Sequence, residues 1–164
     1  MKERPIYVID TNVLVDYPSI VPDPKRTAPA LLNPSVDLTG SHRVIPSPVV
    51  RELSGFKGEH SDRGKSAREV LRNTRTYFGG KTCSMADAYE LGLTVDLPDG
   101  GLLSILPVHA DFKAGLPFRP AEDDMDGQII LTAIAAMQVV ASRKDPPPWE
   151  VRGVTGATAR CGKI

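Results

Sequence analysis

The chain has 164 residues, of which 41% are hydrophobic, and its 20 basic and 20 acidic residues give a formal net charge of zero. This size and composition predict one globular domain over residues 1–164. The balanced charge excludes a protein that attracts nucleic acid through its overall field, so any basic surface must be local. No apolar run approaches the roughly 20 residues of a membrane span, and Cys83 and Cys161 form no CxxC pair. We therefore expect a cytoplasmic protein with reduced thiols and no membrane partner.

The first half of the chain predicts two strands and three helices. The continuous apolar run 6–9 is typical of a strand buried on both faces of a parallel sheet. Ser47 and Pro48 favour a helix start, because serine caps helices and proline suits the first helical position. In chain order, the predicted elements are a strand over 6–9, a short helix over 12–17, a loop over 18–42, a strand over 44–45, and helices over 48–56 and 63–78.

The second half predicts two further strands and a long helix. In chain order, the predicted elements are a loop over 81–100 with one helical turn near 85–91, a strand over 102–108, a helix from Asp123 or Asp124 to about Val140, and a strand over 151–155. Strands that alternate with helices favour a mainly parallel sheet. The sequence therefore predicts an α/β protein with three α/β/α layers.

Asp10 follows directly after the first predicted strand, with Thr11 and Asn12 beside it. In open parallel sheets, ligands bind outside the carboxyl ends of the strands, where Asp10 is expected. The side chain has an alternative role, because an aspartate at this position can simply cap the next helix.

Glu52 lies on the apolar side of its predicted helix, between Val49 at i−3 and Phe56 at i+4. A lone carboxylate in apolar surroundings costs several kcal/mol unless something compensates its charge. Glu52 is therefore expected to have a function or a strong partner.

Asp126 shares a predicted stripe with Ile130, Ile134 and Met137, in a helix that is apolar almost all round and is therefore expected to be buried. The alternative is that Asp126, like Asp123 and Asp124, only complements the helix dipole.

Together, the three acids predict a cation site. Converging carboxylates repel one another, and oxygen ligands without a Cys or His cluster suit Mg²⁺ or Mn²⁺. Thr11 and Asn12 are candidates for orienting Asp10 or for holding a metal-bound water. His42, His60 and His109 show no paired zinc-ligand spacing and are expected on the surface or in loops.

A local basic surface is predicted on the helix over 63–78. Arg68, Arg72 and Arg75 recur at i, i+4 and i+7, and Arg63 and Lys65 precede them. Such a stripe suits phosphates, although an ordinary solvated helix face has the same pattern.

Four segments together resemble the successive motifs of PIN-domain ribonucleases. They read VIDTNVLVD, VIPSPVVREL, DDMDGQIILTAIAAM and EVRGVTG, and the segment RGKSARE follows the second. The resemblance is strongest to the N-terminal PIN domain of PhoH-type proteins and more distant to VapC toxins. It implies a PIN-like fold.

The resemblance also implies the site residues. By position, Asp10, Glu52 and Asp126 are the catalytic, metal-binding acids, and Asp124 assists at the metal. The substrate-binding set implied is Asn12, Arg63, Lys65, Arg68, Arg72 and Thr155. The family often has a fourth acid two residues after the final threonine, where this chain has Ala157, and the chain ends soon after it, so we also expect a C-terminal truncation or divergence.

The function implied is metal-dependent endonucleolytic hydrolysis of RNA, single-stranded or in loops. The alternative is a non-catalytic PIN-like module that binds RNA or protein, favoured by Ala157. A haloacid-dehalogenase-type phosphotransferase is a further rival, but Asn12 replaces its second aspartate. The resemblance also implies homodimerisation, and either a C-terminal ATPase domain in a longer protein or an antitoxin partner.

Overall fold

In the computed structural model of the protein, the described residues are 5–25, 31–33, 36–79, 94–106, 120–121, 123–141 and 151–154. Strand β1 (Ile6–Ile9) is an interior strand of the main sheet, and all four of its residues are buried. A strand that is apolar on both faces needs a layer on each side of the sheet, so the rest of the fold is arranged around β1.

Within the described residues, the main sheet has five strands in the order β5-β6-β4-β1-β7. β1 pairs in parallel with β4 (His42–Pro46) on one side and with β7 (Val151–Val154) on the other, and β4 pairs in parallel with β6 (Leu102–Leu106). Only β5 (Thr94–Asp96) is antiparallel, at the edge. The chain therefore extends the sheet first on one side of β1 and later on the other, which is the strand arrangement that places ligands at the carboxyl end of the central strands.

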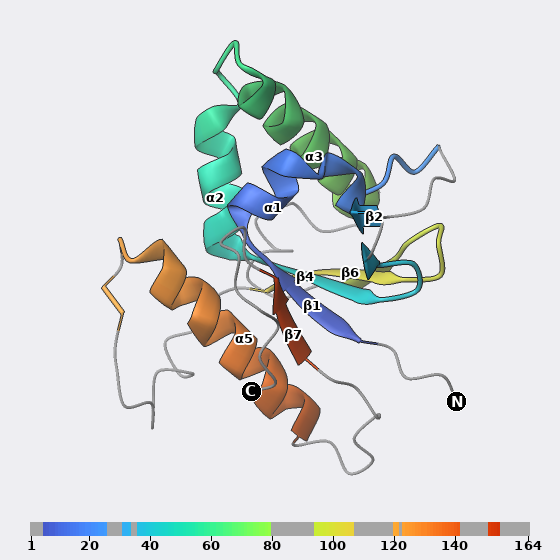
Figure 1. Ribbon diagram of the computed structural model, residues 1–164, viewed down its shortest axis with the longest axis vertical. Coiled ribbons are helices and arrows are strands. Elements are labelled where there is room, and N and C mark those ends of the chain that lie inside the picture. The colour runs from blue at the N-terminus through green and yellow to red at the C-terminus, as the bar shows by residue number, and fades with distance from the viewer. Residues whose placement is uncertain are drawn as a thin grey trace.

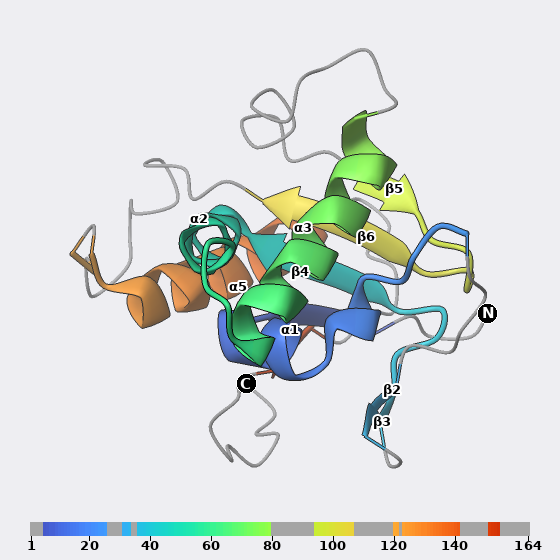
Figure 2. The same cartoon turned by 90° about the horizontal axis from the view of Figure 1, so that it is seen from above.

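Helices cover both faces of this sheet (Figures 1 and 2). On one face lie α1 (Thr11–Asp16), the 3-10 turn η1 (Pro18–Ile20), α2 (Ser47–Phe56) and α3 (Asp62–Gly79). On the other lies α5 (Met125–Ala141), which contacts β7, β1 and β4. The predicted α/β fold with three layers is confirmed.

The structure confirms the four predicted strands and the four predicted helices, with boundaries that move by a few residues. The loop predicted over 18–42 is wrong in part, because it contains η1 and the antiparallel pair β2 (Leu31–Asn33) and β3 (Val36–Asp37). These strands are so short that two-residue periodicity cannot mark them. The helical turn predicted near 85–91 and the last residues of the strand predicted over 102–108 lie outside the described residues.

β5 was predicted as loop and is a strand. Its three residues pair with β6 through a turn in which the Leu97 backbone NH donates to the Gly101 carbonyl at 2.9 Å. Gly100 in this turn has φ 78°, a backbone conformation that favours glycine. The pairing partner, and not the strand's own sequence, determines its structure.

The core lies between the sheet and the layer of α1, α2 and α3. Fully buried side chains there include Ile9, Leu14, Ile45, Leu53 and Leu103. Among the described residues, no helix is both long enough and apolar enough to cross a membrane.

Candidate functional site

Asp10 lies where β1 ends and α1 begins, at the carboxyl edge of the sheet. Its backbone is extended, and its Oδ1 accepts a hydrogen bond from the Val13 backbone NH at 2.9 Å, so it caps α1. The side chain is 9% exposed. The predicted capping role is therefore confirmed.

Glu52 lies on α2 and points toward the start of α1. The Thr11 hydroxyl donates a short hydrogen bond to Glu52 Oε2. Thr11 is 3% exposed and Glu52 is half-buried, while Val49 and Leu53 on the same helix are fully buried. The chain neighbour of Asp10 thus holds Glu52 through its buried hydroxyl, although the two acids are 42 positions apart in the sequence.

Sequence reasoning considered Thr11 only as a partner of Asp10 or of a metal-bound water. Its contact with Glu52 depends on how α1 and α2 pack, and no sequence spacing indicates it. The available signal was weaker: a threonine at the first helical position, directly after a strand end, has a hydroxyl that the adjacent helix can reach.

Asp126 lies in the first turn of α5 and is exposed. The predicted buried stripe from Asp126 through Ile130 is wrong, because Ile130 is 52% exposed and Ile129 and Leu131 are the buried residues. A helix that is apolar all round has no periodic signal to show which side meets the sheet, so the pattern could not select the buried face. The argument that Asp126 must be a buried charge therefore fails.

Asp124 caps α5. Its Oδ1 accepts a hydrogen bond from the Gly127 backbone NH at 2.9 Å, and its carbonyl accepts one from the Gln128 NH at 3.0 Å. A Cβ on Gly127 would lie 2.4 Å from Asp124 Oδ2, so this close approach requires glycine. The carboxylate of Asp124 therefore has a structural role, which makes it a weaker candidate for metal binding than the sequence suggested.

The structure brings Thr11, the neighbour of Asp10, into contact with Glu52, whereas Asp126 is exposed in the first turn of α5. Among the described residues, no group of three or more His, Cys, Asp or Glu side chains is placed to hold a metal ion. The start of α5 nevertheless lies on the side of the molecule where α2 begins, and the two helices contact each other (Figures 1 and 2). Thr155 and Ala157 lie outside the described residues.

A surface cavity lies on another side of α2. Within the described part of the chain it is lined by Ser47, Val50, Arg51 and Ser54. These residues form one stripe at i, i+3, i+4 and i+7, while Glu52 projects from a different side of the helix toward Thr11. The cavity therefore does not belong to the acid pair.

Two predicted substrate-binding arginines make contacts within the protein. The Arg63 guanidinium lies 3.6 Å from the centre of the Phe56 ring, and Arg68 Nη1 donates to the carbonyls of Lys57 and Glu59 at 2.7 and 2.8 Å. Both contacts brace the turn between α2 and α3. The other predicted substrate-binding residues that the structure describes, Asn12, Lys65 and Arg72, are exposed.

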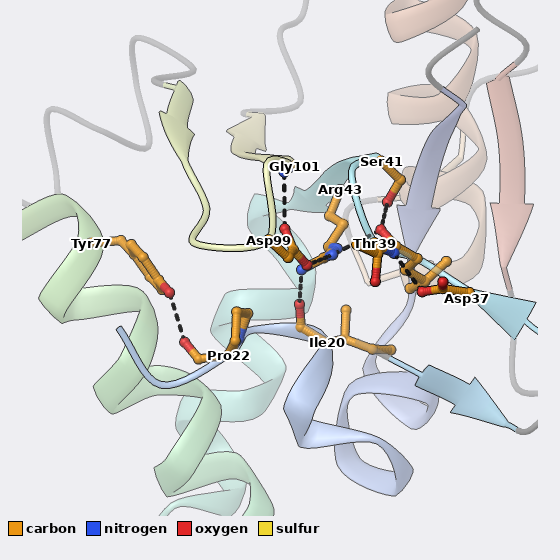
Figure 3. A network of polar contacts seen from close by, with 10 residues as sticks. Ile20, Pro22, Asp37, Thr39, Ser41, Arg43, Tyr77, Asp99 and Gly101 are labelled. Atoms are coloured by element: carbon orange, nitrogen blue, oxygen red, sulfur yellow. Dashed lines mark hydrogen bonds and ion pairs between the residues drawn. The ribbon is translucent and has the colours of Figure 1, made fainter. Parts of the chain in front are cut away.

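A second polar cluster lies at the opposite, amino-terminal end of the sheet (Figure 3). Arg43 of β4 is fully buried, forms an ion pair with Asp99, and donates to the carbonyls of Ile20 and Leu38 at 2.9 and 2.8 Å. Asp99 Oδ1 accepts from the Gly101 NH at 2.9 Å. Sequence reasoning missed this cluster, although a lone arginine within a short apolar strand was a signal for a buried partner.

Tyr77 of α3 lies next to this cluster and donates to the Pro22 carbonyl at 2.9 Å. Burial raises the pKa of the Tyr77 hydroxyl, and the negative charges of Asp99 and Asp23 raise it further against the opposing effect of Arg43. The ring therefore keeps its proton at a higher pH than a free tyrosine does.

Fold and site together define an α/β protein with an acid pair at the carboxyl edge of a mainly parallel sheet. A family model described as "PIN domain" matches residues 7–141, which is more than half of the 164-residue chain. The chain therefore belongs to the PIN-domain family, whose members are generally nucleases and commonly metal-dependent ribonucleases. The comparisons with curated proteins and with solved structures gave no match. The matched region contains Asp10, Glu52 and Asp126.

Proposed function

We propose that this protein is an endoribonuclease that hydrolyses RNA phosphodiesters with Mg²⁺ or Mn²⁺ held at Asp10 and Glu52. The observation that carries the proposal is the contact of Glu52 with Thr11, the neighbour of Asp10 at the carboxyl edge of the sheet, together with membership of the PIN-domain family.

The donor atoms fit a hard divalent cation. Asp10 and Glu52 offer carboxylate oxygens, and Mg²⁺ usually binds through one or two carboxylates while it keeps several waters and contacts substrate phosphate. We keep Asp126 as the third catalytic acid of the proposal, because it lies in the first turn of a helix that contacts α2. Asp124 is a less favourable ligand, because one of its oxygens already caps α5.

In the proposed mechanism the bound metal supplies Lewis acidity and an activated water for attack on phosphorus. Asp10 is held in place by its capping hydrogen bond and by the strand that precedes it. Thr11 holds Glu52 by its hydroxyl, so both carboxylates are fixed before substrate arrives. The chain's own contribution is this preorganised pair, because a rigid arrangement requires little rearrangement when the phosphodiester binds.

One rival function is favoured by a specific observation. Ala157 stands where the family often has a fourth acid, so the protein is alternatively a PIN-like module that binds RNA or protein without cleaving it. The proposal has four finer parts. They are closeness to PhoH-type or VapC proteins, homodimerisation, an ATPase domain or antitoxin as partner, and a cytoplasmic location.

Asp10→Asn tests the proposal, because asparagine still caps a helix and removes only the charge. We expect the wild-type protein to gain about 2.7 kcal/mol of unfolding free energy at a Mn²⁺ concentration of about 100 Kd, and to cleave a mixed RNA pool. Asp10→Asn should lose both effects while its metal-free stability stays close to that of the wild type. Thermal melts with and without Mn²⁺ and a gel assay of the RNA measure these quantities.

Asp16→Asn is the matched control, because Asp16 is an exposed acid at the other end of the same helix. It should keep both the metal response and cleavage. Equal cleavage by wild type and Asp10→Asn would show a contaminating nuclease and overturn the proposal. A wild-type protein that binds Mn²⁺ and RNA but leaves the RNA intact would support the non-catalytic alternative instead.

A further inference from the structure

The outer face of α3 carries a cationic stripe, which we define as Lys65, Arg72 and Arg75. All three side chains are exposed, and none has a hydrogen-bond or ion-pair partner within the described residues. Ten residues separate the first from the last, which is about 15 Å along a helix. Arg68 lies between them, but its guanidinium is held by two backbone carbonyls.

The opposite face of α3 is buried against the protein, so the stripe faces solvent. Ala67, Val70, Thr74 and Phe78 are buried, and α3 packs against both α1 and α2. Asn73 adds a hydrogen bond from its side-chain amide to the Val21 carbonyl at 2.9 Å. Since its apolar side is covered, α3 cannot insert into a lipid surface as an amphipathic membrane helix does.

The stripe lies in the same layer as the acid pair. α1 begins beside Asp10, α2 carries Glu52, and α3 crosses these two helices and leads away from the end of α2 (Figures 1 and 2). A polyanion on the stripe can therefore continue over the same layer toward the acids. The net charge of the whole chain is zero, so this local concentration of positive charge is what would hold a polyanion.

We propose that Lys65, Arg72 and Arg75 bind the phosphates of single-stranded RNA outside the cleavage site, as an extended substrate-docking surface. This inference rests on the proposed ribonuclease function. A protein partner fits poorly, because the stripe has no exposed apolar side chain to form an interface core. A single strand fits better than a duplex, because the bound chain must bend from α3 toward the sheet edge.

Two acids of α3 lie within reach of the stripe: the exposed Asp62, three residues before Lys65, and Glu69. Glu69 is half-buried and stands four residues after Lys65 and three before Arg72, so it shares their side of the helix. Its negative charge opposes phosphate binding. It therefore provides a substitution with the opposite expected effect, because Glu69→Gln should tighten RNA binding while the loss of the cations weakens it.

The test measures binding of a labelled single-stranded RNA by fluorescence anisotropy, in chelator so that no cleavage occurs, between about 50 and 200 mM salt. Three phosphate contacts on a single strand contribute about 2 to the slope of log affinity against log salt, which is about a 20-fold fall in affinity over that range. The triple variant Lys65→Gln, Arg72→Gln and Arg75→Gln should lose this part of the slope. The matched control Lys65→Arg, Arg72→Lys and Arg75→Lys keeps every charge and should keep the slope.

The outcomes separate this inference from the function on which it rests. If the wild type cleaves RNA in a metal-dependent way and the triple variant keeps the full salt slope, the docking surface is wrong and the nuclease stands. If no variant cleaves RNA but the slope changes as expected, the nuclease is wrong and the RNA-binding stripe stands. Tighter binding of a duplex than of a single strand would also overturn the proposed substrate class. Thermal melts of each variant check that the fold is intact.

Discussion

Two polar clusters lie at opposite ends of the same sheet, and they differ in the charges that they bring together. At the amino-terminal end, the fully buried Arg43 meets the carboxylate of Asp99 and two carbonyls. At the carboxyl end, Asp10 accepts a hydrogen bond from the Val13 backbone NH, and Glu52 accepts one from the Thr11 hydroxyl. Both clusters join segments that are distant in the sequence.

The difference indicates what each cluster does. A buried charge that is paired with an opposite charge needs no ion from solution. Although the Arg43 Nε has no hydrogen-bond partner, both of its terminal nitrogens have one, so the Arg43 cluster holds the β4 strand, the η1 turn and the β5–β6 turn together. At the carboxyl edge, two carboxylates come from neighbouring helices, and because like charges repel, the Asp10 cluster can gain from an added cation. The charges gathered in each cluster therefore distinguish a structural cluster from a candidate binding site within one sheet.

The largest expected effect comes from Arg43→Met, which breaks the ion pair of Arg43 and Asp99. This substitution keeps much of the side-chain volume but leaves the carboxylate of Asp99, whose side chain is 8% exposed, without its partner. We expect a loss of about 3–5 kcal/mol in the free energy of unfolding, measured by urea denaturation. The stabilisation by Mn²⁺ should be unchanged, because the acid pair lies at the other end of the sheet.

Asp99→Asn in the Arg43→Met background is the matching test of this cluster. Removing the second charge should restore part of the lost stability, because no unpaired charge then remains buried. Strictly additive losses in the double variant would show that the two side chains act independently, against the network drawn in Figure 3.

The next largest effect is expected at the acid pair of Asp10 and Glu52, from Thr11→Val. Valine keeps the shape of threonine but cannot donate to Glu52, and loss of a partner that orients a ligand typically weakens metal affinity about 10–100-fold. Titration of Mn²⁺ against thermal stability measures this loss. Thr11→Ser keeps the hydroxyl and should restore affinity to near that of the wild type. If valine and serine have equal affinity, the Thr11 contact does not position Glu52.

The smallest effect is a pH dependence of the folding stability, and it comes from Tyr77 beside the Arg43 cluster. The pKa of Tyr77 is raised by burial and by Asp99, so the folded protein holds this proton more tightly than the unfolded chain. The resulting stability is fully present below the ordinary tyrosine pKa of about 10 and is lost as pH rises through the folded value.

Tyr77→Phe tests this prediction. It should cost about 1 kcal/mol at neutral pH through the lost hydrogen bond to Pro22, and its stability should fall less steeply than that of the wild type above about pH 10. Denaturation curves across this pH range measure both. Parallel pH profiles for the two proteins would contradict the raised pKa of Tyr77.

Much of the fold could be predicted from local pattern. The apolar run at 6–9 forms an interior strand of the main sheet, as expected. α2 begins near the predicted position, but the predicted capping by Ser47 is wrong, because Pro46 is the N-cap and no side chain caps the helix. The face of α5 could not be predicted, because its sequence is apolar on every side and only contact with β7, β1 and β4 selects the buried one. β5 was missed because three residues become a strand only beside β6.

The candidate site divides in the same way. The sequence alone determined Asp10 at the end of a buried strand and Glu52 on a helix with buried neighbours, because strand and helix periodicity place these side chains. Only the tertiary structure decided that Thr11 contacts Glu52, that Arg63 and Arg68 brace a turn, and that Arg43 is buried with Asp99. The physical reason is that periodicity states which side of an element a residue occupies, whereas its partner is determined by how separate elements pack.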